Sequence, residues 1–267
     1  MKDIKFETGS LVCLGIEAAV MILLPIIVMI IWKKKTGAKL KPIIIGAVTF
    51  FLFAIILKTV PAYFLFAADN PAAKAINNNI WLYYVTAGIL AGIFEETGRY
   101  TAFRTVLKNN TDKVTSISYG IGHGGFESIY LAYSILIMLV MGIMINSGNI
   151  DQITNGLEGE QLETALTQLR DYSQITFSMS LLGIWERIST IMLHISLSII
   201  VFKAAHDKKY LILYPAAILI HVLADFSVVL TRLFPAVVFE VIIFIFSAVL
   251  LILVYRYVYK NNQNNTQ

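Results

Sequence analysis

The chain has 267 residues, of which 57% are hydrophobic and only 14% are charged, and its mean hydropathy is +0.73. A soluble domain carries about 25% charged residues, so this composition excludes an ordinary soluble protein and indicates a polytopic helical membrane protein in the lipid bilayer. The formal net charge of +4 is compatible with a nucleic-acid binder. The basic residues lie in short segments beside apolar runs, however, so membrane topology explains them and we expect no nucleic-acid partner.

Apolar windows predict about seven membrane-spanning helices within a single integral membrane domain, residues 1–267. The predicted spans are residues 11–32, 43–66, 81–107, 117–145, 177–202, 211–230 and 237–258. Five lysines within residues 33–41 follow the first span and should be cytoplasmic by the positive-inside rule. Alternation then places the N-terminus outside and the C-terminus in the cytoplasm, with most of the remaining Lys and Arg on the cytoplasmic side.

The longest loop, residues 146–176, is acidic and is predicted to lie outside. Leu162, Leu166 and Leu169 recur in it at helical spacing, which predicts a short amphipathic helix. Packing on the bundle surface explains such a stripe better than a lid over a substrate does. The tail, residues 261–267, has no apolar residue to bury and is predicted to be disordered.

The third span carries Glu95, Glu96 and Arg99 deep within an apolar run. An ionisable side chain at that depth costs about 2.5–3.5 kcal/mol or more, so such groups usually face the protein interior and mark a functional site. On a helix, Gly92 shares a face with Glu95 and Arg99, where it would let a neighbouring helix approach closely. Arg99 is the expected charge partner of the carboxylates. Lys58, in the second span, is expected to be isolated and to extend toward the outer interface.

Three later spans carry the other candidate site residues. These are His123 and Glu127 in the fourth span, Glu186, Arg187 and His194 in the fifth, and His221 and Asp225 in the sixth. His123 and Glu127, like His221 and Asp225, are four residues apart and share a helix face. Adjacent Glu186 and Arg187 predict a structural ion pair or a gate in the outer half of the membrane. His194 alone is compatible with an interhelical contact or with a ligand. His206, between Ala205 and Asp207, is expected in a solvated cytoplasmic loop.

Most of these groups fall at one depth. Counted at about 1.5 Å per residue from the cytoplasmic end of each span, Glu95 and Glu96 lie about 17 Å deep, and the three membrane histidines and Glu127 lie about 9–15 Å deep. Carboxylates and imidazoles in one layer suit hydrolysis, because a glutamate in a dry pocket can deprotonate water, helped by histidines or by a divalent metal. Imidazole and carboxylate are ordinary zinc ligands, and the soluble-protease motif HExxH is absent. The candidate metal ligands are His123, Glu127, His194, His221 and Asp225.

The order of these motifs resembles a known group. Glu95-Glu96 with the following Arg99, Tyr119-x-x-x-His123, His194 and His221-x-x-x-Asp225 look like the motifs of the CAAX prenyl protease and bacteriocin-processing intramembrane protease superfamily. The stretches Phe-Glu-Glu-Thr-Gly-Arg and Gly-His-Gly-Gly-Phe-Glu are most similar to its YhfC-type branch of membrane peptidases. The resemblance covers the third to the sixth span. It implies an intramembrane endopeptidase in the bacterial plasma membrane, acting on a membrane-associated peptide or protein with the help of a divalent metal, expected to be zinc.

The resemblance also implies roles for individual residues. Glu95 or Glu96 would act with His123 as the base that activates water, and His221 with Asp225 would stabilise the oxyanion. Arg99 stands three residues after Glu96, where the superfamily has four, so the choice of base stays open. Asp225 stands where asparagine is common, and an ionised carboxylate is a poor oxyanion donor. This departure fits metal binding, or orientation of His221, more readily.

Two other functions are compatible with the same residues. Membrane carboxylates and histidines also serve proton relays and ion paths, so a proton- or metal-ion-coupled transporter is the main alternative. Transporters often contain internal repeats, and none is visible here. A catalytically silent membrane scaffold is the third hypothesis, and the density of ionisable groups in the spans argues against it.

Overall fold

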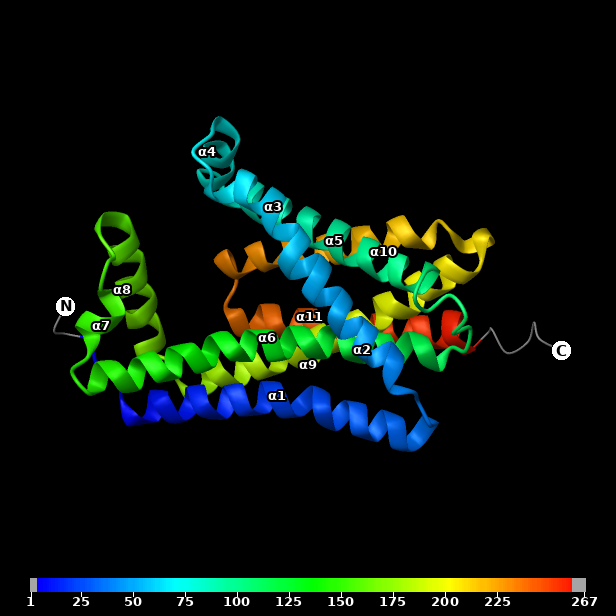
Figure 1. Cartoon of the computed structure of the whole chain (residues 1–267), viewed down its shortest axis with the longest axis horizontal. Coiled ribbons are helices and arrows are strands. Elements are labelled where there is room, and N and C mark those ends of the chain that lie inside the picture. The colour runs from blue at the N-terminus through cyan, green and yellow to red at the C-terminus, as the bar shows by residue number, and fades with distance from the viewer. Residues whose placement is uncertain (1–3, 261–267) are drawn as a thin grey trace. The chain divides into compact units, whose positions relative to one another are not determined.

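The computed structural model describes residues 4–260, and within that range every regular element is a helix, which confirms the predicted all-α fold (Figure 1). The elements are α1 (Thr8–Thr36), α2 (Leu40–Thr49), η1 (Phe50–Leu57), α3 (Lys58–Ala62), η2 (Tyr63–Ala67), α4 (Pro71–Asn77), α5 (Ile80–Arg104), α6 (Val114–Asn146), α7 (Ile150–Thr154), α8 (Gly159–Ser173), α9 (Phe177–His206), η3 (Lys208–Tyr210), α10 (Leu213–Phe226), η4 (Ser227–Arg232), α11 (Ala236–Val254) and η5 (Tyr255–Lys260). The disorder predicted for residues 261–267 concerns a segment outside the described residues.

Within residues 4–260, six helices are long and apolar enough to cross a membrane. They are Thr8–Thr36, Leu40–Ala67, Val114–Asn146, Phe177–His206, Lys208–Arg232 and Ala236–Lys260. Each overlaps a predicted span and extends it by a few residues. The remaining predicted span corresponds to α5. With 25 residues it is comparable in length to the six helices, but it carries Glu95, Glu96, Arg99 and Arg104. The sidedness of the termini stays a prediction.

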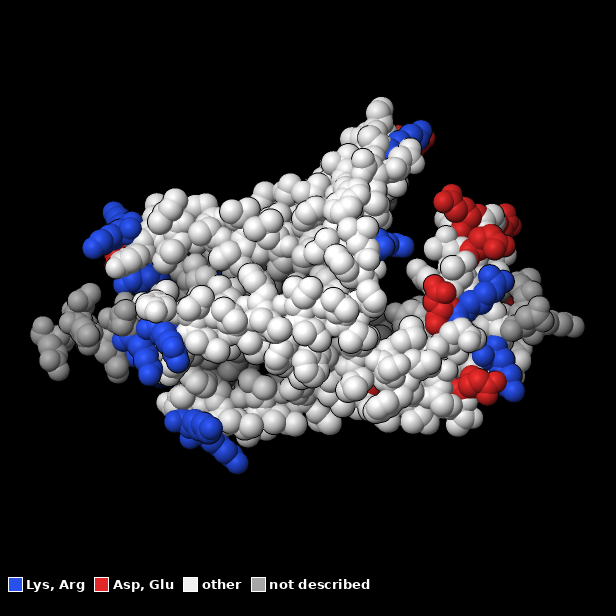
Figure 2. Space-filling model, turned by 180° about the vertical axis from the view of Figure 1, so that it is seen from behind, with Lys and Arg blue, Asp and Glu red and all other residues white. Residues whose placement is uncertain are grey.

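The outward faces of these helices are apolar. On α11, Ile242, Ile245 and Val249 are each about half exposed. On the face shown in Figure 2, most of the surface is without charged side chains. A surface this apolar indicates contact with lipid rather than water.

The chain divides into two compact units, and both the first boundary and the last fall inside long helices. The first unit comprises the described residues up to Leu24 together with Ser128–Arg187, and the second comprises Pro25–Glu127 together with the described residues from Ile188 onward. In the first unit, Leu166 and Leu169 of α8 are buried beside Phe6 and Leu14. The side-chain amide of Asn146 holds Phe6 in this core, because it accepts a hydrogen bond from Phe6 N (3.0 Å) and donates one to Phe6 O (2.7 Å).

In the second unit, α5 and α10 lie side by side (Figure 1). Gly92 permits this approach: a Cβ atom there would lie 2.7 Å from Val222 Cγ2 and 3.0 Å from the carbonyl oxygen of Ile218. Gly92 stands one turn before Glu95, so a close approach of the two helices falls beside the carboxylates. The close helix contact predicted at Gly92 is therefore present, and it brings the polar face of α10 toward that of α5.

A second close approach fixes α6, which carries His123. A Cβ atom on Gly122 would overlap the backbone carbonyl of Ile43 in α2, so a larger residue cannot fit without moving one of the two helices. The ring of Phe50, directly after α2, stands edge-on to that of His123 with 5.2 Å between centroids. The position of His123 therefore depends on backbone contact between α2 and α6.

We expect Gly122→Ala to lower the free energy of unfolding by about 1–3 kcal/mol, because the added methyl group meets backbone rather than a flexible side chain. Reversible unfolding in detergent micelles measures this. The matched control is Gly15→Ala in α1, whose Cβ would lie 3.8 Å from Leu139 Cδ2 in ordinary contact. That variant should be unchanged or more stable by up to about 1 kcal/mol, because alanine favours helix. Wild-type stability of Gly122→Ala would contradict the packing described here.

Candidate functional site

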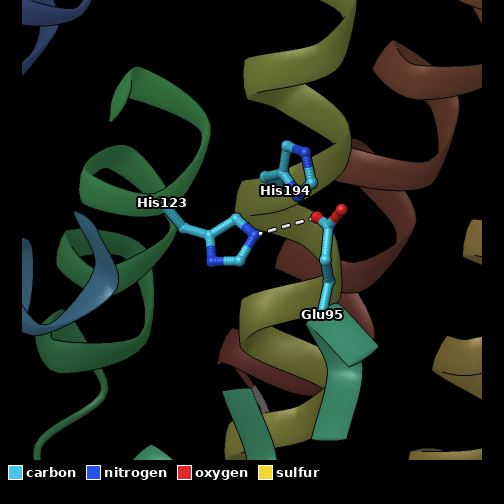
Figure 3. A group of neighbouring side chains, drawn as sticks. All are labelled: Glu95, His123 and His194. Carbon is cyan, nitrogen blue, oxygen red and sulfur yellow. Dashed lines mark hydrogen bonds and ion pairs between the residues drawn. The ribbon is translucent and has the colours of Figure 1, made fainter. Parts of the chain in front are cut away.

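A buried group of three ionisable side chains lies inside the second unit. Glu95 of α5, His123 of α6 and His194 of α9 point toward one another (Figure 3). Each offers one ligand atom, and these atoms lie within 4.8 Å of one another. His123 Nε2 is 3.2 Å from Glu95 Oε2, and the two imidazole centroids are 4.8 Å apart. All three residues are buried. We refer to Glu95, His123 and His194 as the Glu-His-His cluster.

The adjacent carboxylate, Glu96, has different partners. Its Oε1 lies 2.8 Å from His221 Nδ1, and its Oε2 forms a 3.0 Å ion pair with Arg99 Nε. An ionised carboxylate only accepts hydrogen bonds, so His221 Nδ1–H is the donor. Glu96 is completely buried, and both of its oxygens face groups of its own chain. The structure thus separates the two glutamates: Glu95 faces the imidazoles of the cluster, and Glu96 holds Arg99 and His221.

Arg99 connects α5 to α9. Its Nη1 donates to the carbonyl oxygen of His194 (2.7 Å) and to Ser198 Oγ, and its Nη2 lies 3.1 Å from His194 Nδ1. A guanidinium has no acceptor, so Nδ1 of His194 must accept, and the ring proton is on Nε2. That nitrogen lies 2.6 Å from Glu127 Oε2 and donates to it. Arg99 therefore sets both the orientation and the tautomer of His194.

His221 and Asp225 complete the site. His221 Nε2 lies 3.8 Å from Glu95 Oε2 and 3.7 Å from Asp225 Oδ2, both ion-pair contacts longer than hydrogen bonds. With Glu96 at Nδ1, three carboxylates thus surround this imidazole. The side chains of Asp225 and Glu127 are 39% and 19% exposed, so these two carboxylates have access to the surroundings that Glu95 and Glu96 lack.

The structure brings together eight of the predicted polar residues in the second unit. They are Glu95, Glu96, Arg99, His123, Glu127, His194, His221 and Asp225. The predicted pair Glu186 and Arg187 belongs instead to the first unit, where the two side chains form an ion pair and Arg187 is buried.

Three side chains differ from the expectation or were missed. Lys58 is not isolated as predicted, because its Nζ lies 3.7 Å from Glu95 Oε1. Ser198 was missed, although a polar residue four positions after His194 in an apolar span was a usable signal. His206 was expected in a solvated loop, and this is wrong: α9 continues to His206. Its ring is tilted against that of Phe202, with 4.2 Å between centroids, and its Nδ1 lies 3.0 Å from the Phe202 carbonyl oxygen.

The chain is thus a polytopic helical membrane protein with a buried carboxylate–imidazole centre inside its helices. Its sequence belongs to the YhfC intramembrane metalloprotease family, whose family model matches residues 20–246. It is 34% identical over 223 residues to the uncharacterized membrane protein YhfC of Bacillus subtilis (strain 168), covering 83% of this chain and 84% of that protein. No solved structure matches the chain. The predicted resemblance to the YhfC-type branch is confirmed, and a location in the bacterial plasma membrane is consistent with this relative. The wider superfamily relationship stays a prediction.

Proposed function

We propose that the chain is an intramembrane endopeptidase that hydrolyses a peptide bond of a membrane-associated peptide or protein. The observation that carries this proposal is the Glu-His-His cluster, three buried ligand groups within 4.8 Å inside a membrane bundle. Membership of a family of intramembrane metalloproteases supports the same reaction class.

The residues of the cluster fit a divalent metal. Two imidazoles and one carboxylate are a common set of protein ligands for catalytic zinc, which leaves a position for water. The 3.2 Å between His123 Nε2 and Glu95 Oε2 is close to the ligand separation of about 3.3 Å expected for a tetrahedral zinc site. His123 Nδ1 has no hydrogen-bond partner among residues 4–260, so no protein group fixes a lone pair there, and the ring can carry its proton on Nδ1 while Nε2, which faces Glu95, binds a metal. We propose zinc as the metal.

The charges around the cluster also favour a divalent cation. Glu95, Glu96, Glu127 and Asp225 supply four carboxylates, against two side-chain cations, Lys58 and Arg99. The group would carry a formal charge of −2 with neutral imidazoles and of −1 with His221 protonated, in a low-dielectric environment where unbalanced charge is expensive. In both states the group attracts a divalent cation.

In the proposed reaction Glu95, His123 and His194 would hold the metal, which when bound would lower the pKa of a water molecule and polarise the scissile carbonyl. Glu127 is the proposed proton acceptor, because it is partly exposed and already contacts His194 Nε2 at 2.6 Å. This assignment replaces the earlier choice between Glu95 and Glu96 as base, since Glu95 is taken as a ligand and Glu96 holds Arg99.

His221 is the proposed acid. Its Nδ1–H is fixed on Glu96 at 2.8 Å, which leaves Nε2 facing Glu95 and Asp225. Three surrounding carboxylates favour the protonated ring electrostatically, so His221 can deliver a proton to the leaving amine or stabilise the oxyanion. Asp225 is then the group that keeps His221 oriented. This is one of the two roles that fit an aspartate at a position where asparagine is common.

Metal content tests the proposal first. We expect near-stoichiometric zinc in detergent-purified wild type, and its loss in folded His123→Ala and His194→Ala. Elemental analysis measures the zinc, and thermal unfolding verifies that the variants are folded. His206→Ala is the matched control, because His206 is the one histidine of the chain outside the site and should retain the zinc.

Assays on the same protein reconstituted in proteoliposomes distinguish an endopeptidase from a transporter. New peptide termini in co-reconstituted membrane proteins, identified by mass spectrometry and dependent on Glu127, would support hydrolysis. Zinc or proton flux across the vesicles without any new termini would contradict the proposal and favour the transporter.

A further inference from the structure

Lys58 is a charged side chain that the proposed reaction does not use. It begins α3 in the middle of the second membrane-crossing segment, Leu40–Ala67. Phe50 and Ala54, eight and four positions earlier, are both buried, so Lys58 follows the inward side of this segment. Both η1 and α3 pack against α5, and the Lys58 ammonium lies 3.7 Å from Glu95 Oε1.

The contact is an ion pair without hydrogen-bond geometry, since 3.7 Å exceeds the usual range of about 2.7–3.2 Å for an N–H···O bond. It engages Oε1, whereas Oε2 faces His123 at 3.2 Å. The Lys58 side chain is 28% exposed, in contrast to fully buried Arg99. A long, flexible and partly exposed side chain can move its head toward the membrane interface at modest cost.

We propose that Lys58 is the exchangeable counter-ion of Glu95: its ammonium neutralises the carboxylate in the metal-free protein, and a divalent metal displaces it. This inference rests on the proposed metal site. The two cations share one carboxylate, so their mutual repulsion makes binding of the metal compete with the Lys58 ion pair. A directional hydrogen bond would instead have indicated that Lys58 orients Glu95 for the metal.

The test compares Lys58→Met with wild type in two measurements. Competition with a chelating dye should give a zinc dissociation constant at least about tenfold lower in Lys58→Met, because the competing cation is gone. Without zinc the variant should unfold at a lower temperature than wild type, and zinc should raise that temperature by more than in wild type. Lys58→Gln should behave like Lys58→Met, and Lys58→Arg should restore the wild-type affinity.

Lys74→Met is the matched control. Lys74 also pairs with a carboxylate, at 2.6 Å from Asp69, but both side chains are exposed and neither belongs to the site. Its zinc affinity should equal that of wild type. Equal or weaker zinc binding in both Lys58→Met and Lys58→Gln would overturn the inference while leaving the metal site intact. A folded wild-type protein that binds no zinc would overturn the proposed function and the inference together.

Discussion

Replacing Glu95 with glutamine should abolish peptide-bond cleavage, with a loss of at least about 10³-fold, while the protein stays folded. Glu95 is the proposed carboxylate ligand of the cluster, and an amide lacks the charge that holds a divalent cation. Zinc should therefore be lost together with cleavage. Mass spectrometry of new peptide termini in proteoliposomes measures the cleavage, and elemental analysis of the same sample measures the zinc.

Glu127→Gln is the matched variant for this experiment. It replaces a carboxylate next to the same histidine, His194, but one to which we assign proton transfer rather than metal binding. At saturating zinc it should retain the metal, with affinity lower by about 10–100-fold, and lose cleavage. Full cleavage in Glu95→Gln would contradict the proposed function. Loss of zinc at saturation in Glu127→Gln would instead make Glu127 a ligand, as the sequence first suggested.

Much of the fold followed from the sequence because the bilayer imposes strong constraints. Apolar length identified the six helices that are apolar enough to cross, whereas α5 has the length of a span but is interrupted by charged residues. The same constraint located the site: an ionisable side chain such as Glu95 or His194 in a span has to face the interior, and counting residues along the spans placed these groups in one layer.

The pairing within that layer could not be predicted, because it depends on how each helix is rotated and on which helices touch. Spacing made Arg99 the expected partner of both carboxylates, and the ion pair is made with Glu96, three residues before it. Lys58 was predicted to be isolated because neither sequence segment, taken alone, shows that the second span contacts α5. His206 was misjudged because α9 extends four residues beyond the predicted end of its span, at Phe202.

These pairings give the two glutamates separate tasks in the proposed site. Glu95 is left facing His123 and Lys58, groups that a metal can join or displace. Glu96 is held in a chain of fixed contacts from His221 through the carboxylate to Arg99 and on to His194. That chain of contacts links α5, α9 and α10. We therefore expect a substitution at Arg99 to lower the stability of the fold, and to reduce function as a consequence.

Arg99→Met should lower the free energy of unfolding by about 3–5 kcal/mol, because it leaves the Glu96 carboxylate buried without its cation. It also removes the donors to the His194 carbonyl oxygen and Nδ1. Unfolding in mixed micelles measures the change. Arg104→Met is the control on the same helix: Arg104 is exposed and donates to the Ala205 carbonyl oxygen at 3.0 Å, so the variant should lose less than about 1.5 kcal/mol.

The double variant Arg99→Met/Glu96→Gln distinguishes an unpaired charge from lost packing. If the buried carboxylate causes the instability, neutralising it should recover about 1–3 kcal/mol relative to Arg99→Met alone. Additive losses in the two single variants would instead show that Glu96 and Arg99 act independently, contrary to their 3.0 Å ion pair. Recovery of stability without recovery of zinc binding would assign Arg99 a further task, that of orienting the His194 ring in the cluster through its contacts with the His194 carbonyl oxygen and Nδ1.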